Sequence, residues 1–433
     1  MKNKELINRS LNSVWHPCTQ MKHHECSPLI PIKKGRGSWL VDFNDKKYLD
    51  ATSSWWVNLF GHNNLVIKNH IKNQLDQLEH SMIAGLTHEP VIELSEKLNH
   101  MTGLGHCFYG SDGSSAVEIA LKMSSHYWRQ KGEHKKTKFV YLKNSYHGET
   151  LGALSVTDIP LFKDQYSHLM KNHIQIDSPD WRLGKENETA KEIAIKKISK
   201  LKIIFEEKHS LISSIILEPL VQCAAGMGMY DAEYIKGVRK LCDQYQIHLI
   251  ADEIAVGFGR TGKMFAHHHA EIKPDFLCLS KGLTGGYLPL SVTLTTTDVY
   301  NAFYDNDVKK GFLHSHSYTG NPLACSAALG TLSIFNSTDV LLENRNKANK
   351  INFMMEGYKN LPIKNLRNIG MIWAFELNEN INMSKVINYC IDHGLLIRPI
   401  KSTIYFMPPY SISEKEINHM VRVTENGIKK ACI

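Results

Sequence analysis

Two stretches decide the fold: Asp275-Phe-Leu-Cys-Leu-Ser-Lys-Gly-Leu-Thr-Gly-Gly286 and, before it in the chain, Ile250-Ala-Asp-Glu-Ile-Ala-Val-Gly-Phe-Gly-Arg-Thr-Gly262. Each piece contains a short apolar run, which is typical of a strand buried on both faces of a parallel sheet. One run ends at Asp252, and Lys281 follows the other closely. Open parallel sheets bind their ligands beyond the carboxyl ends of the strands. We therefore expect both side chains at one site.

An acid and a lysine in these positions indicate a pyridoxal 5'-phosphate (PLP) site. Lys281 would hold the cofactor as a Schiff base, and Asp252 would keep the pyridine nitrogen protonated, which makes the ring an electron sink. The lysine amine must be neutral to react, so its surroundings have to lower its pKa. Taken alone, Asp252 is better explained as a turn residue at a strand end. The pairing with Lys281 favours the cofactor.

Two further segments suit the same cofactor. Tyr109-Gly-Ser-Asp-Gly-Ser-Ser-Ala-Val-Glu118 leads into a helix, and Ser115 with Glu118 has the spacing of a capping box. Gly113 and Ser114 would then form a phosphate seat at the helix start, although a plain helix cap explains the segment as well. Tyr146, in Asn144-Ser-Tyr-His-Gly148, could stack on the cofactor ring or be a buried tyrosine of a surface turn.

The pattern along the chain predicts an α/β fold. Buried strands are expected at 139–142, 214–217, 248–251 and 276–279, and helices from Ala116 to Tyr127 and from Ala194 to Phe205. A hairpin is expected within 39–51. After about residue 326 come an Asn- and Lys-rich helix, strand-like runs at 369–376 and 404–407, and a helix around Val386. We predict a three-layer domain with a mainly parallel central sheet (61–325) and a small α+β domain (326–433). Residues 1–60 would form an N-terminal arm and part of the small domain.

Composition narrows the function classes. The 433 residues carry a formal net charge of +8. The densest lysine stretch, 131–143, fits a solvated helix end and loop better than a nucleic-acid patch. Nine scattered cysteines without a Cys-x-x-Cys pair favour reduced thiols in a cytosol over a zinc site or a disulfide framework. No secretion signal or membrane-spanning run is recognisable. We expect a soluble, cytoplasmic protein with no nucleic-acid, membrane or metal partner.

Taken together, these motifs resemble the class III (ornithine and ω-amino acid) aminotransferases of fold-type I, over nearly the whole chain. The resemblance implies that Lys281 holds PLP and shuttles a proton, that Asp252 pairs with the pyridine nitrogen, and that Tyr146 stacks on the ring. Gly113 and Ser114 would bind the phosphate. His316 and Ser317 would reach the phosphate of the neighbouring subunit's cofactor, which implies a homodimer with shared active sites.

Within that class, three segments are similar to the branch that serves biotin synthesis. They are Val14-Trp-His-Pro17, Ser53-Ser-Trp-Trp56 and Arg398-Pro399, which precedes Tyr405-Phe-Met-Pro-Pro-Tyr410. This resemblance implies ping-pong transfer of an amino group from S-adenosylmethionine to 8-amino-7-oxononanoate. Trp55 would wall the substrate site, Arg398 would pair with the substrate carboxylate, and Ser315 and Tyr405 would line the path.

Two positions depart from that branch. Cys18 stands where a tyrosine is usual, which removes a hydroxyl expected near the substrate. His314-Ser-His-Ser317 stands where His-Gly-Pro-Thr is usual, so the backbone near His316 is in question. His267-His-His269 resembles a metal motif, but without a spaced partner it fits a solvated loop better.

Several alternatives remain open from the sequence. Lysine could be the amino donor to the same acceptor, or the substrate could be another ω-amino acid such as ornithine or 4-aminobutyrate. Trp55 and Trp56 could be core aromatics, and Arg398 could belong to a surface ion pair. A non-catalytic PLP-fold protein or a basic nucleic-acid-associated protein would be expected to lack Lys281 or Asp252.

Overall fold

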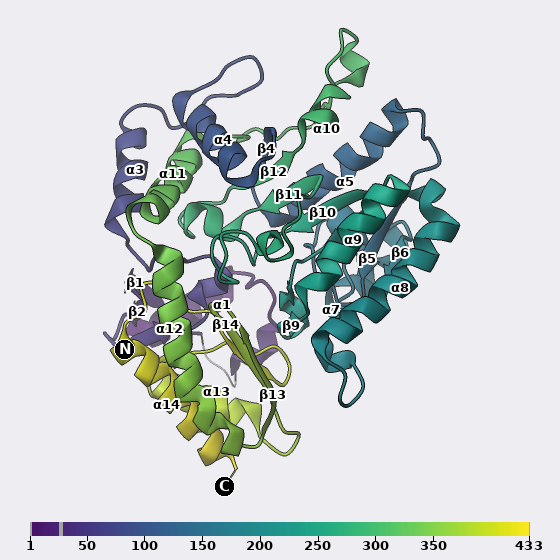
Figure 1. The fold of residues 1–433 in the computed structure, drawn as a ribbon. Coiled ribbons are helices and arrows are strands. Elements are labelled where there is room, and N and C mark those ends of the chain that lie inside the picture. The colour runs from purple at the N-terminus through teal and green to yellow at the C-terminus, as the bar shows by residue number, and fades with distance from the viewer. Residues whose placement is uncertain (1, 26–28, 433) are drawn as a thin grey trace.

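A seven-stranded sheet forms the centre of the protein (Figure 1). The computed structural model describes residues 2–25 and 29–432. Only β12 runs against the other strands, since it pairs antiparallel with both β4 and β11. The sheet is therefore mainly parallel, as predicted. In spatial order the strands are β4 (His106–Gly110), β12 (Ser291–Thr295), β11 (Phe276–Leu279), β10 (His248–Asp252), β7 (Ile212–Leu217), β5 (Lys138–Leu142) and β6 (Ile174–Ile176).

Alternating residues of the central strands pack against helices on opposite faces. Ile216, Ile250 and Phe276 lie in register on neighbouring strands and pack with α5 (Gly113–Gln130). Ile215 and Leu249 point the other way and pack with α8 and α9. A strand buried on both faces needs this continuous apolar run. The other helices of this part are α3 (Leu65–Leu75), α4 (Glu89–Thr102), α6 (Leu151–Ser155), α7 (Pro160–Lys163), α8 (Ala190–Lys208), α9 (Ala232–Tyr245), α10 (Thr297–Asn301) and α11 (Pro322–Ser337).

The two ends of the chain meet below this sheet, where both termini lie in Figure 1. The expected hairpin is confirmed, because β2 pairs antiparallel with β3, and β15 adds to β3 in parallel. A separate sheet has the order β13-β14-β16. The elements are α1 (Lys2–Ser13), β1 (Ile32–Arg36), β2 (Trp39–Asp42), β3 (Lys47–Asp50), α2 (Ser53–Trp56), α12 (Val340–Met355), β13 (Ile363–Ile369), β14 (Ile372–Leu377), α13 (Met383–Asp392), β15 (Leu395–Leu396), β16 (Thr403–Phe406) and α14 (Glu414–Ala431).

The predicted strands and helices of the central part are confirmed, with small shifts at their ends. The strand-like run at 369–376 is interrupted, because Ile369 ends β13 and a turn at Gly370 precedes β14. The helix α1 at residues 2–13 of the N-terminal arm was not predicted from the sequence. The short strands of this segment are present as β1 to β3, and α1 itself buries none of its residues fully.

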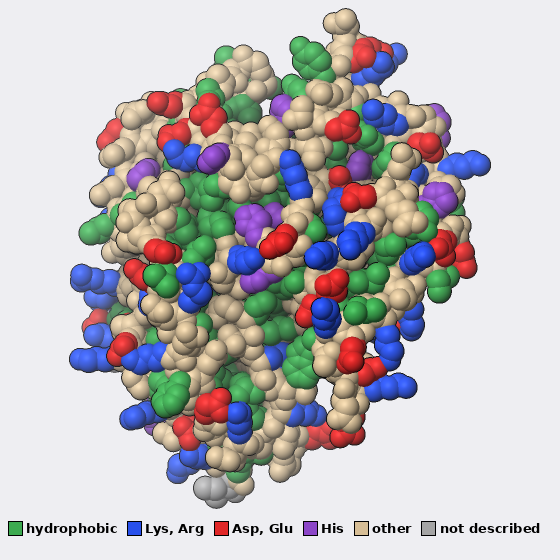
Figure 2. Space-filling model, in the orientation of Figure 1, with side chains coloured by type: hydrophobic (Ala, Val, Ile, Leu, Met, Phe, Trp, Pro, Cys, Tyr) green, Lys and Arg blue, Asp and Glu red, His purple; other side chains and the backbone are tan. Residues whose placement is uncertain are grey.

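One lysine of the 131–143 stretch is not solvated. Lys136 is buried, and its ammonium donates to the carbonyls of His209, Ile212 and Gln246 at 3.1, 3.1 and 2.7 Å. The same ammonium lies 4.4 Å from the Trp128 ring centre. Three carbonyls and an aromatic face replace its water shell. Elsewhere, basic and acidic side chains are interspersed over the face seen in Figure 2.

Within the described residues, no single helix is long and apolar enough to cross a membrane. One pair of helices, Pro322–Ser337 with Val340–Asn360, is long and apolar enough to cross a membrane by length and composition only. The pair is bent by 75° at the break between its helices.

A histidine in the core makes stability depend on pH. His248 is 6% exposed, and burial lowers its pKa to about 4. Between this pKa and the ordinary value near 6.5 the unfolded chain binds a proton that the folded chain does not, so stability falls as pH falls through this window. We expect a loss of about 2 kcal/mol from this group between about pH 7.5 and about pH 5. Urea unfolding of the unaltered protein and of His248→Gln at both pH values checks this.

His248→Gln should show a smaller fall in the free energy of unfolding over that interval. The substitution also removes the hydrogen bond of 3.0 Å between His248 Nδ1 and Ser124 Oγ, which lowers stability at every pH. Each protein is therefore compared with its own free energy of unfolding at the higher pH. An unchanged pH dependence in the variant would assign the acid sensitivity to other groups.

Candidate active site

Lys281 lies just beyond β11 in a strained, partly buried position. Its backbone has φ 41°, in the left-handed region that residues other than glycine adopt at a cost. The ammonium lies 4.5 Å from the ring centre of Trp56. Burial lowers the pKa of Lys281, although Cys223, Asp252 and Glu218 nearby act in the opposite direction. A lowered pKa is what a reactive amine needs, because only the neutral form is a nucleophile.

Asp252 ends β10 beside the end of β11, where it is in register with Cys278. The carboxylate is 4% exposed. Its Oδ2 accepts a hydrogen bond of 2.7 Å from His147 Nδ1, and its Oδ1 accepts one from the amide of Ile254 at 3.1 Å. Two donors on different elements hold the carboxyl group in one orientation. His147 contributes to the site by this bond and had no role predicted from the sequence.

Tyr146 and His147 lie in the loop after β5, and a second buried carboxylate holds this loop. Glu218 follows β7 and accepts from the amides of Tyr146 and Cys223, each at 3.0 Å. Burial and the charge of Asp252 raise the pKa of Glu218 to about 8. Tyr146 Oη donates to Glu149 at 2.8 Å. Burial is the main cause that raises the pKa of Tyr146, and this hydrogen bond raises it further. Glu218 carries no separate signal in the sequence.

The predicted phosphate seat lies at the start of α5, but its cap differs from the expectation. The Ser115–Glu118 capping box was wrong. Asp112 is the N-cap residue, and its side chain accepts from the amide of Ser115 at 2.9 Å. The Glu118 carboxylate instead accepts from the amide of Gly152 at 2.7 Å.

The helix therefore begins at Gly113, which places the amides of Gly113 and Ser114 in its first turn. These are groups that an α-helix cannot satisfy internally, and they suit an anion. The motif glycine Gly148 packs directly on this seat, because a Cβ there would lie 1.9 Å from Ser114 Oγ.

The tryptophan pair separates into one exposed and one buried ring. Trp55 is 40% exposed, and the guanidinium of Arg398 lies 4.3 Å from its ring centre. Trp56 is buried, and its indole N–H donates to Tyr405 Oη at 3.1 Å. In the structure Trp55 therefore contacts Arg398, whereas Trp56 contacts both Tyr405 and Lys281. Cys18 of the N-terminal arm lies near the same place, since the charges of Glu149 and Arg398 both influence the pKa of its thiol, which burial raises.

Two residues of the motifs hold the backbone around Lys281. Gly286 has φ 83°, and a Cβ on it would lie 2.9 Å from the carbonyl carbon of Val57. Only glycine therefore lets the loop after Lys281 approach the segment that follows Trp56. Arg260 is buried and donates to the carbonyls of Pro408 and Asn58 at 2.7 and 3.2 Å. It joins the Trp56 segment to the segment after Tyr405, and the sequence did not single it out.

Ser315, His316 and Ser317 are not joined to Lys281 or Asp252 by any described contact. His316 Nε2 lies 3.3 Å from Ser111 Oγ, next to the phosphate seat of its own chain. The carbonyl of Ser317 accepts from His80 at 2.8 Å, and Ser315 is exposed. Of the three residues, only His316 therefore lies beside the phosphate seat of its own chain.

The solvated loop predicted at 267–269 was wrong for its first member. His267 is 1% exposed, and its Nδ1 lies 2.7 Å from Glu253 Oε1. Glu253 also accepts from the amides of Ala266 and His267. A buried carboxylate needs such partners, so this pair is a packing element below β10.

The residues at the sheet edge fit PLP. The Nε2 atom of His147 is buried and has no hydrogen-bond partner among the described residues, so a polar atom remains available beside Asp252. In such a site Lys281 would supply the amine, Asp252 the anion for the pyridine nitrogen, and Gly113 with Ser114 the donors for the phosphate.

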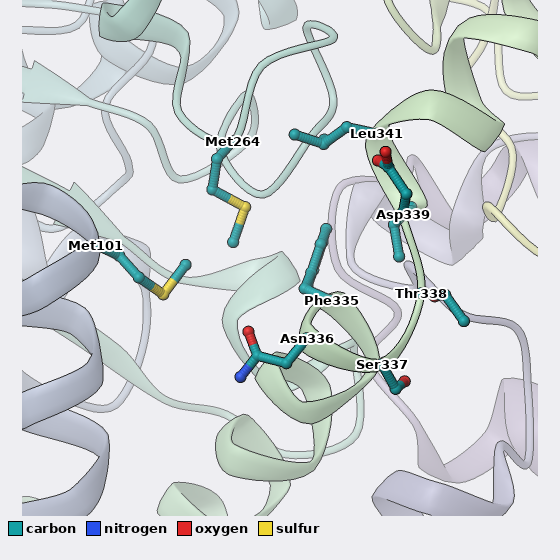
Figure 3. Close-up of a pocket in the computed structure, with 9 residues that line it drawn as sticks. Met101, Met264, Phe335, Asn336, Ser337, Thr338, Asp339 and Leu341 are labelled. Carbon is teal, nitrogen blue, oxygen red and sulfur yellow. The ribbon is translucent and has the colours of Figure 1, made fainter.

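A cavity of about 510 Å³ elsewhere lacks this chemistry (Figure 3). Its lining includes Met101, Met264 and Phe335 and the junction of α11 with α12. Its one acid, Asp339, caps α12 by accepting from the amide of Leu342 at 2.9 Å. None of the predicted site residues lines it.

Comparison with known proteins agrees with this geometry. The family model of class-III aminotransferases matches residues 20–428. An adenosylmethionine-8-amino-7-oxononanoate aminotransferase of Helicobacter pylori is 48% identical over 96% of this chain and 96% of its own.

Two solved structures are similar over almost their whole length. The crystal structure of the adenosylmethionine-8-amino-7-oxononanoate aminotransferase of Methanocaldococcus jannaschii has a TM-score of 0.93 and 37% identity, covering 99% of this chain and 100% of that one. A PLP-bound amine transaminase from an uncultivated Pseudomonas species has a TM-score of 0.91 and 29% identity, covering 97% and 99%.

Proposed function

The chain belongs to the class-III aminotransferase family, and from this premise we propose that it transfers an amino group from S-adenosylmethionine to 8-amino-7-oxononanoate. The product would be 7,8-diaminononanoate, an intermediate of biotin synthesis. The observation that carries this choice is Arg398, whose guanidinium lies over Trp55 beside the ring that covers Lys281. A cation placed there suits an acceptor that has a carboxylate far from its reacting carbonyl.

Each step is assigned to a group of this chain. Bound PLP supplies an electron sink for the negative charge that forms at the α-carbon of the donor. Asp252, fixed by His147 and the amide of Ile254, holds the proton at the pyridine nitrogen. Lys281 anchors the cofactor and then, as a free amine, takes the proton from the donor carbon. Its lowered pKa suits it for that transfer.

The remaining residues bind and orient. Gly113 and Ser114 hold the phosphate at the start of α5, and Tyr146 stacks on the ring from the loop that Glu218 fixes. Trp55 and Tyr405 wall the substrate path, and Arg398 receives the carboxylate as a two-pronged donor. Cys18 lies at this mouth without the hydroxyl usual in that branch. The thiol is a weak donor, so substrate contact there rests on Glu149 and Arg398.

The proposal includes a homodimer. Segments around His80 and His316 contact each other and carry exposed apolar side chains, with Met82 at 59%, Leu313 at 77% and Tyr318 at 66%. Contiguous exposed apolar surface is typical of a subunit interface. In such a dimer Ser315 would line the partner's substrate path, and His316 and Ser317 would reach the partner's phosphate. We place the enzyme in the cytoplasm, where its cysteines would stay reduced.

A half-reaction spectrum tests the function. S-adenosylmethionine, lysine or ornithine is added separately to the purified holoenzyme while the cofactor absorbance is recorded. We expect S-adenosylmethionine alone to convert the cofactor to its amine form, and 8-amino-7-oxononanoate to reverse the change. Conversion by lysine with the same reversal would change the donor. Conversion only by ornithine-like amines would overturn the assignment and leave a different class-III substrate.

A further inference from the structure

The two tryptophans of the site are displayed by a strained turn, residues 51–56, which we call the Trp turn. Ser53, Ser54 and Trp56 have φ of 51°, 60° and 66°, all in the left-handed region and none of them glycine. Ser54 also has ψ −83°, a combination found in strained γ-turns. Each such residue costs on the order of 1–3 kcal/mol and persists only when its surroundings enforce it.

A buried carboxylate holds the central residue of this turn, and Ser53 Oγ adds a hydrogen bond of 2.8 Å to the carbonyl of Met407. Asp50, the last residue of β3, is 1% exposed. Its two oxygens accept from the amide of Ser54 at 2.9 and 2.7 Å, and Oδ2 also accepts from Ser54 Oγ at 3.2 Å. Hydrogen bonds to an ionised acceptor are roughly twice as strong as neutral ones. Asp50 therefore stabilises the strained residue that directly precedes Trp55.

A histidine orients that carboxylate in turn. His62 Nε2 lies 2.9 Å from Asp50 Oδ2, and Asn58 Nδ2 donates to His62 Nδ1 at 3.0 Å. Because Nδ1 accepts, Nε2 carries the proton and donates to Asp50. The backbone of His62 exchanges two hydrogen bonds with Gly37, at 2.9 and 2.7 Å. His62 is thus anchored to the end of β1 and not to the site itself.

We propose that Asp50, held by His62, is a positioning residue that sets Trp55 beneath Arg398 and Trp56 against Lys281. Neither residue reaches the reacting atoms, so their effect passes through the two rings. The contacts that depend on the turn are the Arg398–Trp55 stack at 4.3 Å, the Lys281–Trp56 approach at 4.5 Å and the Trp56–Tyr405 hydrogen bond at 3.1 Å. The part that concerns acceptor binding rests on the proposed function, and the part that concerns Lys281 and the cofactor does not.

The test compares Asp50→Asn with a matched control in the neighbouring strand. Asp42 of β2 is also buried, at 2% exposed, and its carboxylate accepts from the amides of Asn44 and Lys46 and from Tyr48 Oη. Asp42→Asn should therefore lower thermal stability without changing the site. The readouts on the holoenzyme are the visible circular dichroism of the bound cofactor, which reports the asymmetry of the rings around it, and KM and kcat for 8-amino-7-oxononanoate.

We expect Asp50→Asn to reduce the circular-dichroism amplitude and to raise KM by about 10- to 100-fold, the scale of a misplacement near 1 Å. His62→Gln should shift both readouts in the same direction by less, and it serves as the test if Asp50→Asn does not fold. In a Trp55→Leu background, Asp50→Asn should raise KM by less than about threefold, because the pathway through Trp55 is already lost.

Unchanged dichroism and KM in Asp50→Asn and His62→Gln, or changes equal to those of Asp42→Asn, would overturn the proposal. If the effects of Asp50→Asn and Trp55→Leu on KM were additive, the pathway from Asp50 through Trp55 would be overturned. If the unaltered enzyme does not convert 8-amino-7-oxononanoate but Asp50→Asn still lowers the dichroism selectively, the proposed substrate fails and the positioning role stands.

Discussion

Lys281→Ala should abolish turnover and the visible absorbance of the lysine-bound cofactor together. The side chain is asked both to bond the cofactor and to move the proton at the donor carbon, so its removal takes away covalent anchoring and acid–base catalysis at once. We expect turnover to fall by at least about 10⁴-fold, at or beyond the upper end of acid–base catalysis alone. Absorbance spectra of the purified variant with added PLP, and the rate of amino transfer from S-adenosylmethionine, measure the two losses.

Lys136→Met is the matched control, because Lys136 is a buried lysine in the loop that leads into β5 of the same domain. Among the residues that the structure describes, its ammonium contacts three carbonyls and the ring of Trp128, none of which belongs to the motifs of the site. Leaving those carbonyls unsatisfied should cost stability, by about 1–3 kcal/mol for each group, with the cofactor spectrum retained. Turnover by Lys281→Ala at a near-normal rate would overturn the assignment of Lys281.

The central sheet and the ends of its strands were predictable because their signals are local. A run such as Phe276–Leu279 is apolar at every position, which is typical of a strand covered on both faces. Asp252 and Lys281 then lie at one edge by the geometry of parallel strands. Placing Asp252 and Lys281 close together therefore required only the pairing of neighbouring strands, and no other long-range contact.

The supporting residues could not be predicted because their partners are distant in sequence. His147 meets Asp252 across 105 residues, and the indole of Trp56 meets Tyr405 across 349. Glu218 follows a strand and Asp50 ends one. Nothing in their own segments distinguishes them from the acidic residues that are common in turns. Their role appears only when the loops that they hold are seen.

Local competition explains the error at α5. Asp112 and Ser115 are both good N-cap residues, and the capping-box spacing favoured Ser115. The Asp112 side chain accepts from Ser115 instead, and Glu118 contacts the next loop at Gly152. The earlier start leaves the amides of Gly113 and Ser114 in the first turn, where an anion can meet them. The wrong cap and the free amides that would suit a phosphate therefore have one physical cause.

Asp252→Asn should be the second most severe loss. The amide keeps the shape of the side chain and can still accept from His147 Nδ1, but it removes the negative charge that holds a proton on the pyridine nitrogen. We expect the first-order rate of the donor half-reaction to fall by about 10²- to 10⁴-fold, the range of a positioned proton in a transition state. Stopped-flow absorbance after mixing with S-adenosylmethionine measures this rate directly.

His147→Asn separates charge from orientation at the same pair. It leaves the Asp252 carboxylate charged, with the amide of Ile254 still donating to it at 3.1 Å, but it removes the ring that fixes the other oxygen. The half-reaction should therefore slow by only about 10-fold, a scale typical of losing one supporting hydrogen bond of about 1.4 kcal/mol. If both variants were equally impaired, orientation and not charge would be the main contribution of Asp252. If Asp252→Asn kept near-normal rates, the pyridine nitrogen would have another partner, and the reading of the β10 strand end would be wrong.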